Sequence, residues 1–424
     1  MKLTELRKLI EGGALGSYTE LYPDTNEATE RFLKAIDAFA ESYGEDRDVS
    51  VFSVPGRSEI SGNHTDHNAG CVLAGSIDRD IIAIAAKNDD GVIRLYSDGY
   101  TPDEVKIAET TDPAAFADFS SAALIAGTVN GFVNAGYLVG GYDAYTTSEV
   151  LKGSGISSSA AYEVMIGNIL SNLYNDGGIT SVELAKIAKY AENVYFGKPC
   201  GLMDQMACAV GGFVYMDFKN QNEPEIEPIN FALTDAGYSI CIVNTGGNHA
   251  DLNEDYASVP GEMKAVAKLL GSEVLRGFKE EDIIKNLNNL RRLVGDRAIM
   301  RTLHFLRENK RVVKIKEALL SSDVESFLNG VRESGRSSFE FLQNVYSNKN
   351  VKEQGLSLAL ALTEGCLEGK DYAARVHGGG FAGTIQVLVK NEDVTAYTQY
   401  MDSIFGDGAA VAFRIRPVGA TKLF

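Results

Sequence analysis

The segment Pro55–Gly70, PGRSEISGNHTDHNAG, concentrates polar and charged side chains between two predicted strands. Such a cluster suits a hydrophobic core poorly, whereas paired donors and acceptors are what sugar hydroxyls need. His64, Asp66 and His67 could instead ligate a metal ion. Cys71 is the only further histidine or cysteine nearby in the sequence, so we favour recognition of a polar ligand over a metal site.

The loop Lys152–Ala161, KGSGISSSAA, places two glycines and three serines at the start of a predicted helix. Gly153 and Gly155 let the backbone bend tightly and bring N–H groups close to a ligand. The free amides and the positive dipole end of the helix favour phosphate oxygens. The loop lacks the Gly-Lys-Ser/Thr ending of the common P-loop. Taken alone, the loop has a simpler alternative as an ordinary turn with a serine N-cap, since loops of glycine and serine are abundant.

The elements that position these segments follow from hydrophobic periodicity. We expect a strand at 49–54 that ends in a turn at 55–56, strands between 71 and 97, and a strand at 213–218. Helices are expected over 26–43, 112–135, 160–174 and 182–195. The second half is predicted to contain a strand at 239–244 and a mostly helical stretch over 262–367. A strand–turn–strand unit around 378–383 and 410–416 follows. The change near residue 220 predicts domains 1–220 and 221–424.

Length and composition narrow the class of protein. A chain of 424 residues suggests two or three domains. Its 40 Lys and Arg against 58 Asp and Glu give a net charge of −18 without a basic tract, so nucleic acid is not expected as a partner. Five scattered cysteines indicate free thiols in a reducing compartment. The N-terminal residues lack the apolar core of a signal peptide, and the apolar run 81–86 is too short for a membrane span. We therefore expect a cytoplasmic protein with no membrane partner.

Four segments, in this order, resemble the motifs of the galactokinases, which belong to the GHMP kinase superfamily. The first is similar to G-R-x-N-x-I-G-E-H-T-D-Y-N-x-G, and the serine loop resembles the second GHMP motif. ENVYFGKPCGLMDQ (192–205) is similar to E-x-x-x-x-G-x-x-C-G-I-M-D-Q, and RVHGGGFAG (375–383) to R-M-T-G-G-G-F-G-G. The resemblance implies an α+β, two-domain GHMP kinase fold. It implies an N-terminal mixed-sheet domain and a helix-rich C-terminal α+β domain, with the active site in the cleft between them.

The resemblance assigns the reaction to Asp204 and Arg57. Asp204 falls on the aspartate that lies beside the anomeric hydroxyl, where a carboxylate can orient the O–H group and accept its proton. Arg57 falls on its paired arginine, which would keep Asp204 ionised and stabilise the developing oxyanion. A helix-capping aspartate and a surface arginine are the structural alternative.

The resemblance also implies ATP as co-substrate and Mg²⁺ as cofactor. Glu192 matches the magnesium-binding glutamate, with the hydroxyl of Ser158 as its partner; a carboxylate and a hydroxyl suit this cation. The alternative for Glu192 is a solvated side chain on a helix face. The implied ATP-binding residues are Gly153, Ser154, Gly155, Ile156, Ser157, Ser158 and Ser159.

The implied sugar contacts are Asn63, His64, Asp66, Gly201 and Tyr256. Asn63 departs from the family, which has a glutamate there for the 6-hydroxyl of the sugar, and Glu59 replaces the family's asparagine. An amide loses a charge-assisted hydrogen bond worth about 1.5–3 kcal/mol. These departures bear on the identity of the substrate more than on the reaction type.

The resemblance thus predicts ATP-dependent phosphorylation of the anomeric hydroxyl of galactose, giving galactose 1-phosphate and ADP, by a monomer. A related GHMP sugar kinase acting on N-acetylgalactosamine, arabinose or another hexose is the main alternative. A non-catalytic galactose sensor is disfavoured because the run Ser157–Ala161 and Asp204 are intact. A mevalonate or homoserine kinase would lack the His-Thr-Asp segment and the Met-Asp-Gln run.

Overall fold

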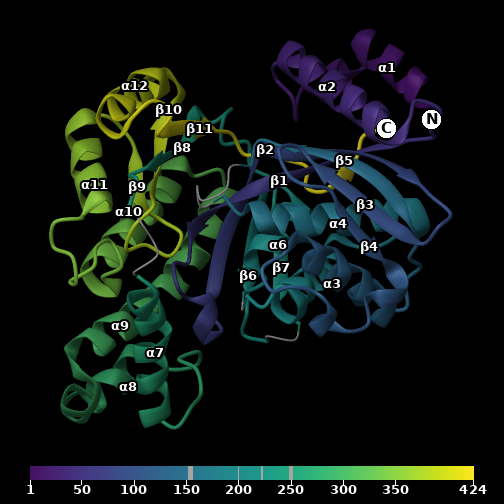
Figure 1. Cartoon of the computed structure of the whole chain (residues 1–424). Helices are drawn as coiled ribbons and strands as arrows, with labels where there is room; N and C mark the ends of the chain where they lie inside the picture. The colour runs from purple at the N-terminus through teal and green to yellow at the C-terminus, as the bar shows by residue number, and fades with distance from the viewer. Residues whose placement is uncertain (151–155, 199, 221–222, 248–251) are drawn as a thin grey trace.

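The computed structural model describes the chain except for residues 151–155, 199, 221–222 and 248–251, and Figure 1 shows its elements. The helices are α1 (Leu3–Glu11), α2 (Thr25–Tyr43), α3 (Ser121–Asn134), α4 (Ser158–Tyr174), α5 (Ser181–Tyr190), α6 (Met203–Val210), α7 (Asn253–Leu269), α8 (Glu280–Lys285), α9 (Leu287–Leu320), α10 (Val324–Ser337), α11 (Gly355–Cys366) and α12 (Val394–Phe405). The strands are β1 (Ser50–Ser61), β2 (Cys71–Lys87), β3 (Val92–Ser97), β4 (Asp103–Lys106), β5 (Tyr142–Ser148), β6 (Phe213–Asp217), β7 (Glu225–Ile229), β8 (Tyr238–Asn244), β9 (Ala373–His377), β10 (Thr384–Lys390), β11 (Ala410–Phe413) and β12 (Thr421–Lys422).

Eight of these strands form a mixed sheet in the order β12-β1-β2-β5-β3-β4, with β6 and β7 continuing from β2. β3 and β5 are parallel, and the other pairs are antiparallel. In β2, Ala83 and Ala85 face the helices α3 to α6, whereas Ile82 and Ile84 face α1 and α2. Because both faces are covered, residues 81–86 of this strand form an unbroken apolar run instead of alternating with polar residues. Figure 1 shows these two helical layers on opposite sides of the sheet.

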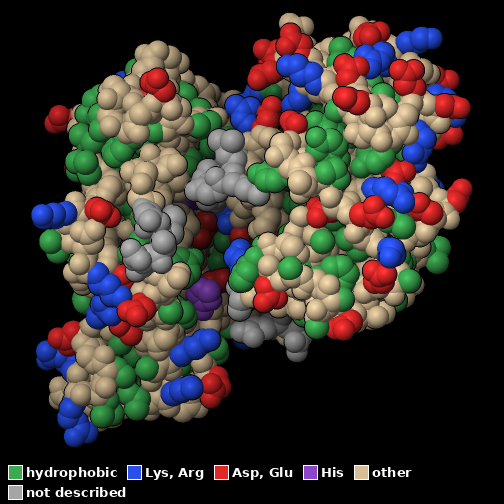
Figure 2. Space-filling model, viewed as in Figure 1, with side chains coloured by type: hydrophobic (Ala, Val, Ile, Leu, Met, Phe, Trp, Pro, Cys, Tyr) green, Lys and Arg blue, Asp and Glu red, His purple; other side chains and the backbone are tan. Residues whose placement is uncertain are grey.

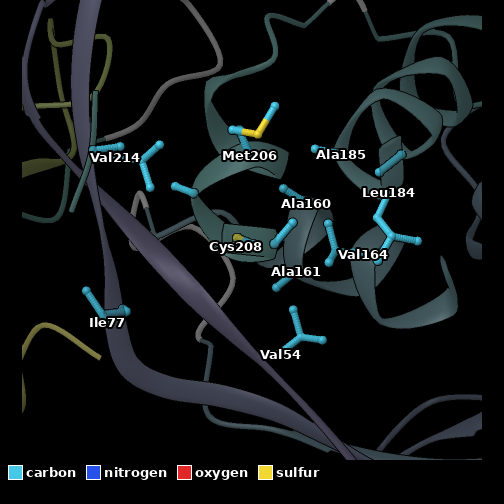
Figure 3. Packing of buried hydrophobic residues seen from close by; sticks show 14 of the residues in the cluster. Val54, Ile77, Ala160, Ala161, Val164, Leu184, Ala185, Met206, Cys208 and Val214 are labelled. Carbon is cyan, nitrogen blue, oxygen red and sulfur yellow. The ribbon is translucent and has the colours of Figure 1, made fainter. Parts of the chain in front are cut away.

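The layer beneath β1 positions two helix N-termini. Val54 of β1 packs with Ala160, Ala161 and Val164 of α4 and with Cys208 of α6, all fully buried, and Figure 3 shows them together. The small alanine side chains let α4 approach the sheet closely. The core therefore places the first turns of α4 and α6 next to β1.

The remaining four strands form an antiparallel sheet in the order β11-β8-β10-β9. One face packs on α11 and α12 through a cluster that includes Val243, Val387, Ala359 and Tyr397. The other face contributes Ile242 to the main core, together with residues of α10. Helices α7 to α9 enclose a separate small core. Within the described residues, no helix is both long and apolar enough for a membrane span.

Several sequence-based boundaries were wrong. The first strand does not end at Pro55–Gly56 but runs to Ser61, because irregular pairing at these residues bends it without breaking it. The helix predicted over 112–135 is a short 3₁₀ turn followed by α3, which is capped by Ser120. Helices α1 and α12 and strands β4, β5, β7 and β12 were not predicted. Strands β7 and β12 join the first sheet from beyond residue 220, so the division into 1–220 and 221–424 stays a prediction.

A buried charge cluster ties distant parts of the first sheet together. Asp80 of β2 accepts hydrogen bonds from Arg31 at 2.6 Å, from Arg416 at 3.0 Å and from Tyr22 at 2.7 Å, and Ser53 also donates to it. Its side chain is only 2% exposed. Burial works against ionisation, but the two guanidinium charges prevail and lower the pKa of Asp80 to about 2.

We predict that Asp80→Asn lowers the free energy of unfolding at pH 7 by about 3–5 kcal/mol, because it leaves buried guanidinium charges without their partner. Urea unfolding followed by circular dichroism measures this. The exposed Asp89→Asn is the matched control and should change the value by less than about 0.5 kcal/mol.

The pH dependence of folding stability tests the role of Asp80 in a second way. The folded pKa of Asp80 lies at about 2, below its ordinary 3.8, so its stabilisation is complete above about pH 4 and is lost towards pH 2. The stability gap between wild type and Asp80→Asn should therefore shrink over this window. A gap that stays constant down to pH 2 would contradict the assignment.

Candidate active site

A cavity of about 430 Å³ lies where β1, the segment after it, the start of α6, α7 and the β9–β10 loop meet. The catalytic and sugar-contact residues predicted from the sequence all line it: Arg57, Asn63, His64, Asp66, Gly201, Asp204 and Tyr256. Glu59, Lys198 and Gly378 to Gly380 also contribute to its wall. Figure 2 shows acidic, basic and histidine side chains gathered in the hollow between the two halves of the molecule.

Arg57 and Asp204 form a two-pronged ion pair at this cavity. The Nε and Nη2 groups of Arg57 donate to Oδ1 and Oδ2 of Asp204, each at 2.8 Å. Arg57 is buried, whereas 32% of the Asp204 side chain remains exposed. Burial raises the pKa of Asp204, but the charge and hydrogen bonds of Arg57 outweigh it, and the pKa falls below its ordinary value. Asp204 is therefore a carboxylate at neutral pH, and the surface-arginine alternative is wrong.

The serine loop reaches the same carboxylate. Ser157 is the N-cap of α4 in a left-handed conformation with φ of 60°, and its Oγ donates to Asp204 Oδ2 at 2.5 Å. The Ile156 side chain is buried in the core, and its carbonyl accepts the backbone N–H of Arg57 at 3.1 Å. Ser158 and Ser159 lie in the first turn of α4. Gly153, Ser154 and Gly155 lie outside the described residues.

Glu192 is not a solvated side chain on a helix face. It is 2% exposed and lies in a π-helical turn, Ala191–Tyr195, at the end of α5. Such a turn contains one extra residue and often marks a functional site. Lys198 donates to Oε1 of Glu192 at 2.8 Å, and Gln205 donates to Oε2 at 2.7 Å. The carboxylate is thus held from two sides beside the start of α4.

Glu192 also contacts a hydroxyl at the start of α4. Among the described residues, Ser159 donates to Glu192 Oε1 at 3.3 Å, whereas the resemblance implies Ser158 as the second magnesium ligand. Successive residues of a helix point about 100° apart, and the sequence pattern alone does not tell which serine faces Glu192. The magnesium roles of Ser158 and Glu192 stay predictions.

His64 lies on the other side of the cavity. Its Nε2 is 2.9 Å from the Gly379 carbonyl. A carbonyl can only accept, so Nε2 carries the proton and Nδ1, which has no partner among the described residues, is an acceptor. Burial and the neighbouring His67 lower the pKa of His64 to about 4, so the ring is neutral. Tyr256 packs edge-on against it at 5.3 Å between ring centroids.

Two glycines allow close approaches that shape the cavity. A Cβ on Gly379 would lie 1.8 Å from the ring of Tyr256, and one on Gly201 would lie 2.8 Å from Oδ2 of Asp66. Both distances are too short for real contacts. Glycine at 379 therefore lets the β9–β10 loop approach α7, and glycine at 201 lets the chain just before α6 approach the segment that follows β1.

Asn63 lines the cavity, but its amide is engaged within the protein. Its Nδ2 donates to Glu59 Oε1 at 3.0 Å and to the Gly378 carbonyl at 2.7 Å, and its Oδ1 accepts from Asn344 at 2.7 Å. Its contact with a sugar stays a prediction. Among the lining residues that sequence reasoning did not assign to the site, two carry charged side chains, Glu59 and Lys198. Glu59 would have followed from a longer β1, on which it shares a face with Arg57, whereas Lys198 occupies a variable position of its motif.

Known proteins match this architecture. Residues 37–87 match the galactokinase galactose-binding signature, and residues 123–212 match the N-terminal domain of the GHMP kinases. The galactokinase of Streptomyces coelicolor is 31% identical over 382 residues, which cover 89% of this chain and 94% of that protein. The galactokinase of Enterococcus faecalis is 28% identical, and the match covers 92% of this chain and 99% of that one.

Solved structures extend the likeness to the fold. The crystal structure of Lactococcus lactis galactokinase complexed with galactose matches with a TM-score of 0.77 at 24% identity, over 92% of this chain and 100% of that chain. A mevalonate kinase matches with a TM-score of 0.60 at 15% identity, over 86% and 98% of the two chains. These structures show that the chain has the GHMP kinase fold. The identity with the Streptomyces protein over nearly the whole of both chains shows further that this chain belongs to the galactokinase family.

Proposed function

We propose that this protein transfers the γ-phosphoryl group of ATP to the anomeric hydroxyl of galactose, giving galactose 1-phosphate and ADP. The observation that carries the proposal is the Arg57–Asp204 pair, which faces a sugar-sized cavity and contacts Ser157 at the start of α4. In this proposal, the ion pair holds the sugar hydroxyl that accepts the phosphoryl group. The N-terminus of α4, whose backbone N–H groups favour phosphate, lies beside it. Membership of the galactokinase family supports the same reaction.

In the proposed mechanism, Asp204 accepts a hydrogen bond from the anomeric hydroxyl and orients its oxygen towards the γ-phosphorus. The new O–P bond forms as the bond to the β–γ bridging oxygen breaks, and the hydroxyl proton passes to Asp204 or to a phosphate oxygen. The lowered pKa of Asp204 makes it a weak base. Phosphoryl transfer through a loose transition state depends mainly on positioning and charge neutralisation, which Arg57 supports.

Magnesium is part of this proposal, with Glu192 and a serine hydroxyl as its ligands. The oxygens of Glu192 and Ser159 lie 3.3 Å apart, and a hard oxygen pair suits a cation that completes its octahedron with phosphate oxygens and water. Ser158, in the same turn, stays a candidate ligand. The bound ion would neutralise charge on the transferring phosphate. Lys198, which is hydrogen-bonded to Glu192, provides a further positive charge there.

A related GHMP sugar kinase is the second candidate, favoured by the asparagine at position 63 and its internal hydrogen bonds. Its substrate would be N-acetylgalactosamine, arabinose or another hexose. We further propose a cytoplasmic location, because all five cysteines are unpaired and ATP is abundant there. A monomeric state is supported by family resemblance alone.

The substrate is tested by coupled ATP-consumption measurements over a panel of galactose, N-acetylgalactosamine, arabinose and glucose. We expect the highest kcat/KM with galactose and the product to carry phosphate on the anomeric oxygen, as ³¹P NMR would show. Turnover of another sugar without turnover of galactose would replace the leading proposal with the second candidate.

Asp204→Asn should reduce kcat about 10²–10⁴-fold, because the amide keeps the shape of the carboxylate but loses the charge that orients the hydroxyl and can accept its proton. Sugar and ATP binding, measured by calorimetry, should remain detectable. The exposed Asp235→Asn serves as control with unchanged turnover. Near-normal kcat in the Asp204 variant would remove this residue from its proposed role.

Glu192→Gln should raise the Mg²⁺ concentration needed for half-maximal turnover at least about tenfold. Loss of a residue that only hydrogen-bonds to a metal ligand already weakens metal binding by roughly this factor. Galactose binding without nucleotide should not change, since the sugar does not need the ion. A titration of turnover against free Mg²⁺ measures the effect. An unaltered Mg²⁺ dependence would exclude Glu192 as a ligand.

A further inference from the structure

The cavity contains a buried carboxylate that the proposed mechanism does not use. Glu59 is 6% exposed and lines the cavity. Its Oε1 accepts from Arg375 Nη2 at 2.6 Å and from Asn63 Nδ2 at 3.0 Å. The described residues donate no hydrogen bond to Oε2, and this oxygen is not fully enclosed. Glu59 therefore keeps one free acceptor oxygen at the cavity.

The bonds of Glu59 also fix its orientation. Arg375 is fully buried, so its guanidinium holds the carboxylate at a defined place instead of leaving it free to rotate into solvent. Asn63 supports the same oxygen from the other side. Because both partners use Oε1, Oε2 is preorganised to accept a hydrogen bond from a ligand.

The position of Glu59 relative to Arg57 indicates which part of a sugar it meets. Arg57 and Glu59 pair with Ser76 and Ala74 of β2 without a register shift between them. The two side chains therefore share a face of β1, one pleat repeat or roughly 6.7 Å apart. Arg57 holds the carboxylate assigned to the anomeric hydroxyl. In a hexopyranose, the C4 and C6 hydroxyls lie at the opposite end of the ring.

We propose that Glu59, and not Asn63, is the side chain that binds the C4 or C6 hydroxyl of the sugar. This inference rests on the proposed function for the placement of the anomeric hydroxyl at Asp204. Residues 59 and 63 have thus exchanged carboxylate and amide relative to the family motif, and the carboxylate remains in the cavity. Arg375 is a positioning residue, since it acts on the sugar only through Glu59.

The test combines Glu59→Gln with galactose and its 4-deoxy and 6-deoxy analogues. Calorimetry should show galactose binding weakened about 10- to 100-fold by the substitution, the value of a charge-assisted hydrogen bond. The analogue that lacks the contacted hydroxyl should bind wild type and variant equally, within about twofold, and thereby identify C4 or C6. The exposed Glu368→Gln is the matched control. Equal weakening for all three sugars would mean that Glu59 has only a structural role and would overturn the inference.

Removal of one buried charge can destabilise the fold, so the double variant Glu59→Gln, Arg375→Gln removes both charges together. It should show the same pattern across the three sugars, whereas full galactose affinity in a folded double variant would overturn the inference. ATP-dependent turnover is measured in parallel. If the enzyme phosphorylates galactose but the three sugars do not show the predicted differences in binding, only the role of Glu59 is refuted. If the binding differences appear but ATP-dependent phosphorylation does not, only the proposed kinase activity is refuted.

Discussion

Arg57 and Asp204 face each other from a strand and a helix that lie almost 150 residues apart in the chain, and the active site depends on this contact. Desolvation of two charges costs several kcal/mol, and the attraction repays it only with good geometry. The two parallel hydrogen bonds and the partial exposure of Asp204 meet that condition. The alanine-rich packing of α4 and α6 beneath β1 keeps the pair in register with Ser157.

The same principle recurs around the cavity, where three carboxylates each have a cationic partner. Asp204 pairs with Arg57, and Glu192 pairs with Lys198. Glu59 pairs with Arg375. The chain carries a net charge of −18, and an anionic nucleotide would otherwise approach an acidic cleft. Local pairing lets the carboxylates act as hydrogen-bond acceptors without creating a strongly negative field where phosphates must bind.

Except for Tyr256, the catalytic and sugar-contact residues could be placed in one cavity from the sequence because they lie within motifs whose order and spacing are specific. Helices such as α2 and α4 followed from apolar periodicity, which local sequence encodes. The extension of β1 beyond Pro55 did not, because a strand can bend at a bulge when its neighbour supplies the hydrogen bonds. The engagement of Asn63 by Asn344 also escaped prediction, since residues 281 positions apart meet only through the tertiary fold.

Strand β12 completes the edge of the first sheet by pairing with β1, and Leu423 donates to the carbonyl of Val51 at 2.8 Å. Roughly 370 residues separate these partners in the chain. Forming this pairing therefore costs a large loop-closure entropy, and such non-local contacts form slowly during folding. During synthesis, the edge of β1 stays without this partner until residue 421 has left the ribosome. An unpaired strand edge is a template for aggregation. The nascent protein must therefore avoid pairing of this edge with other chains for most of its translation.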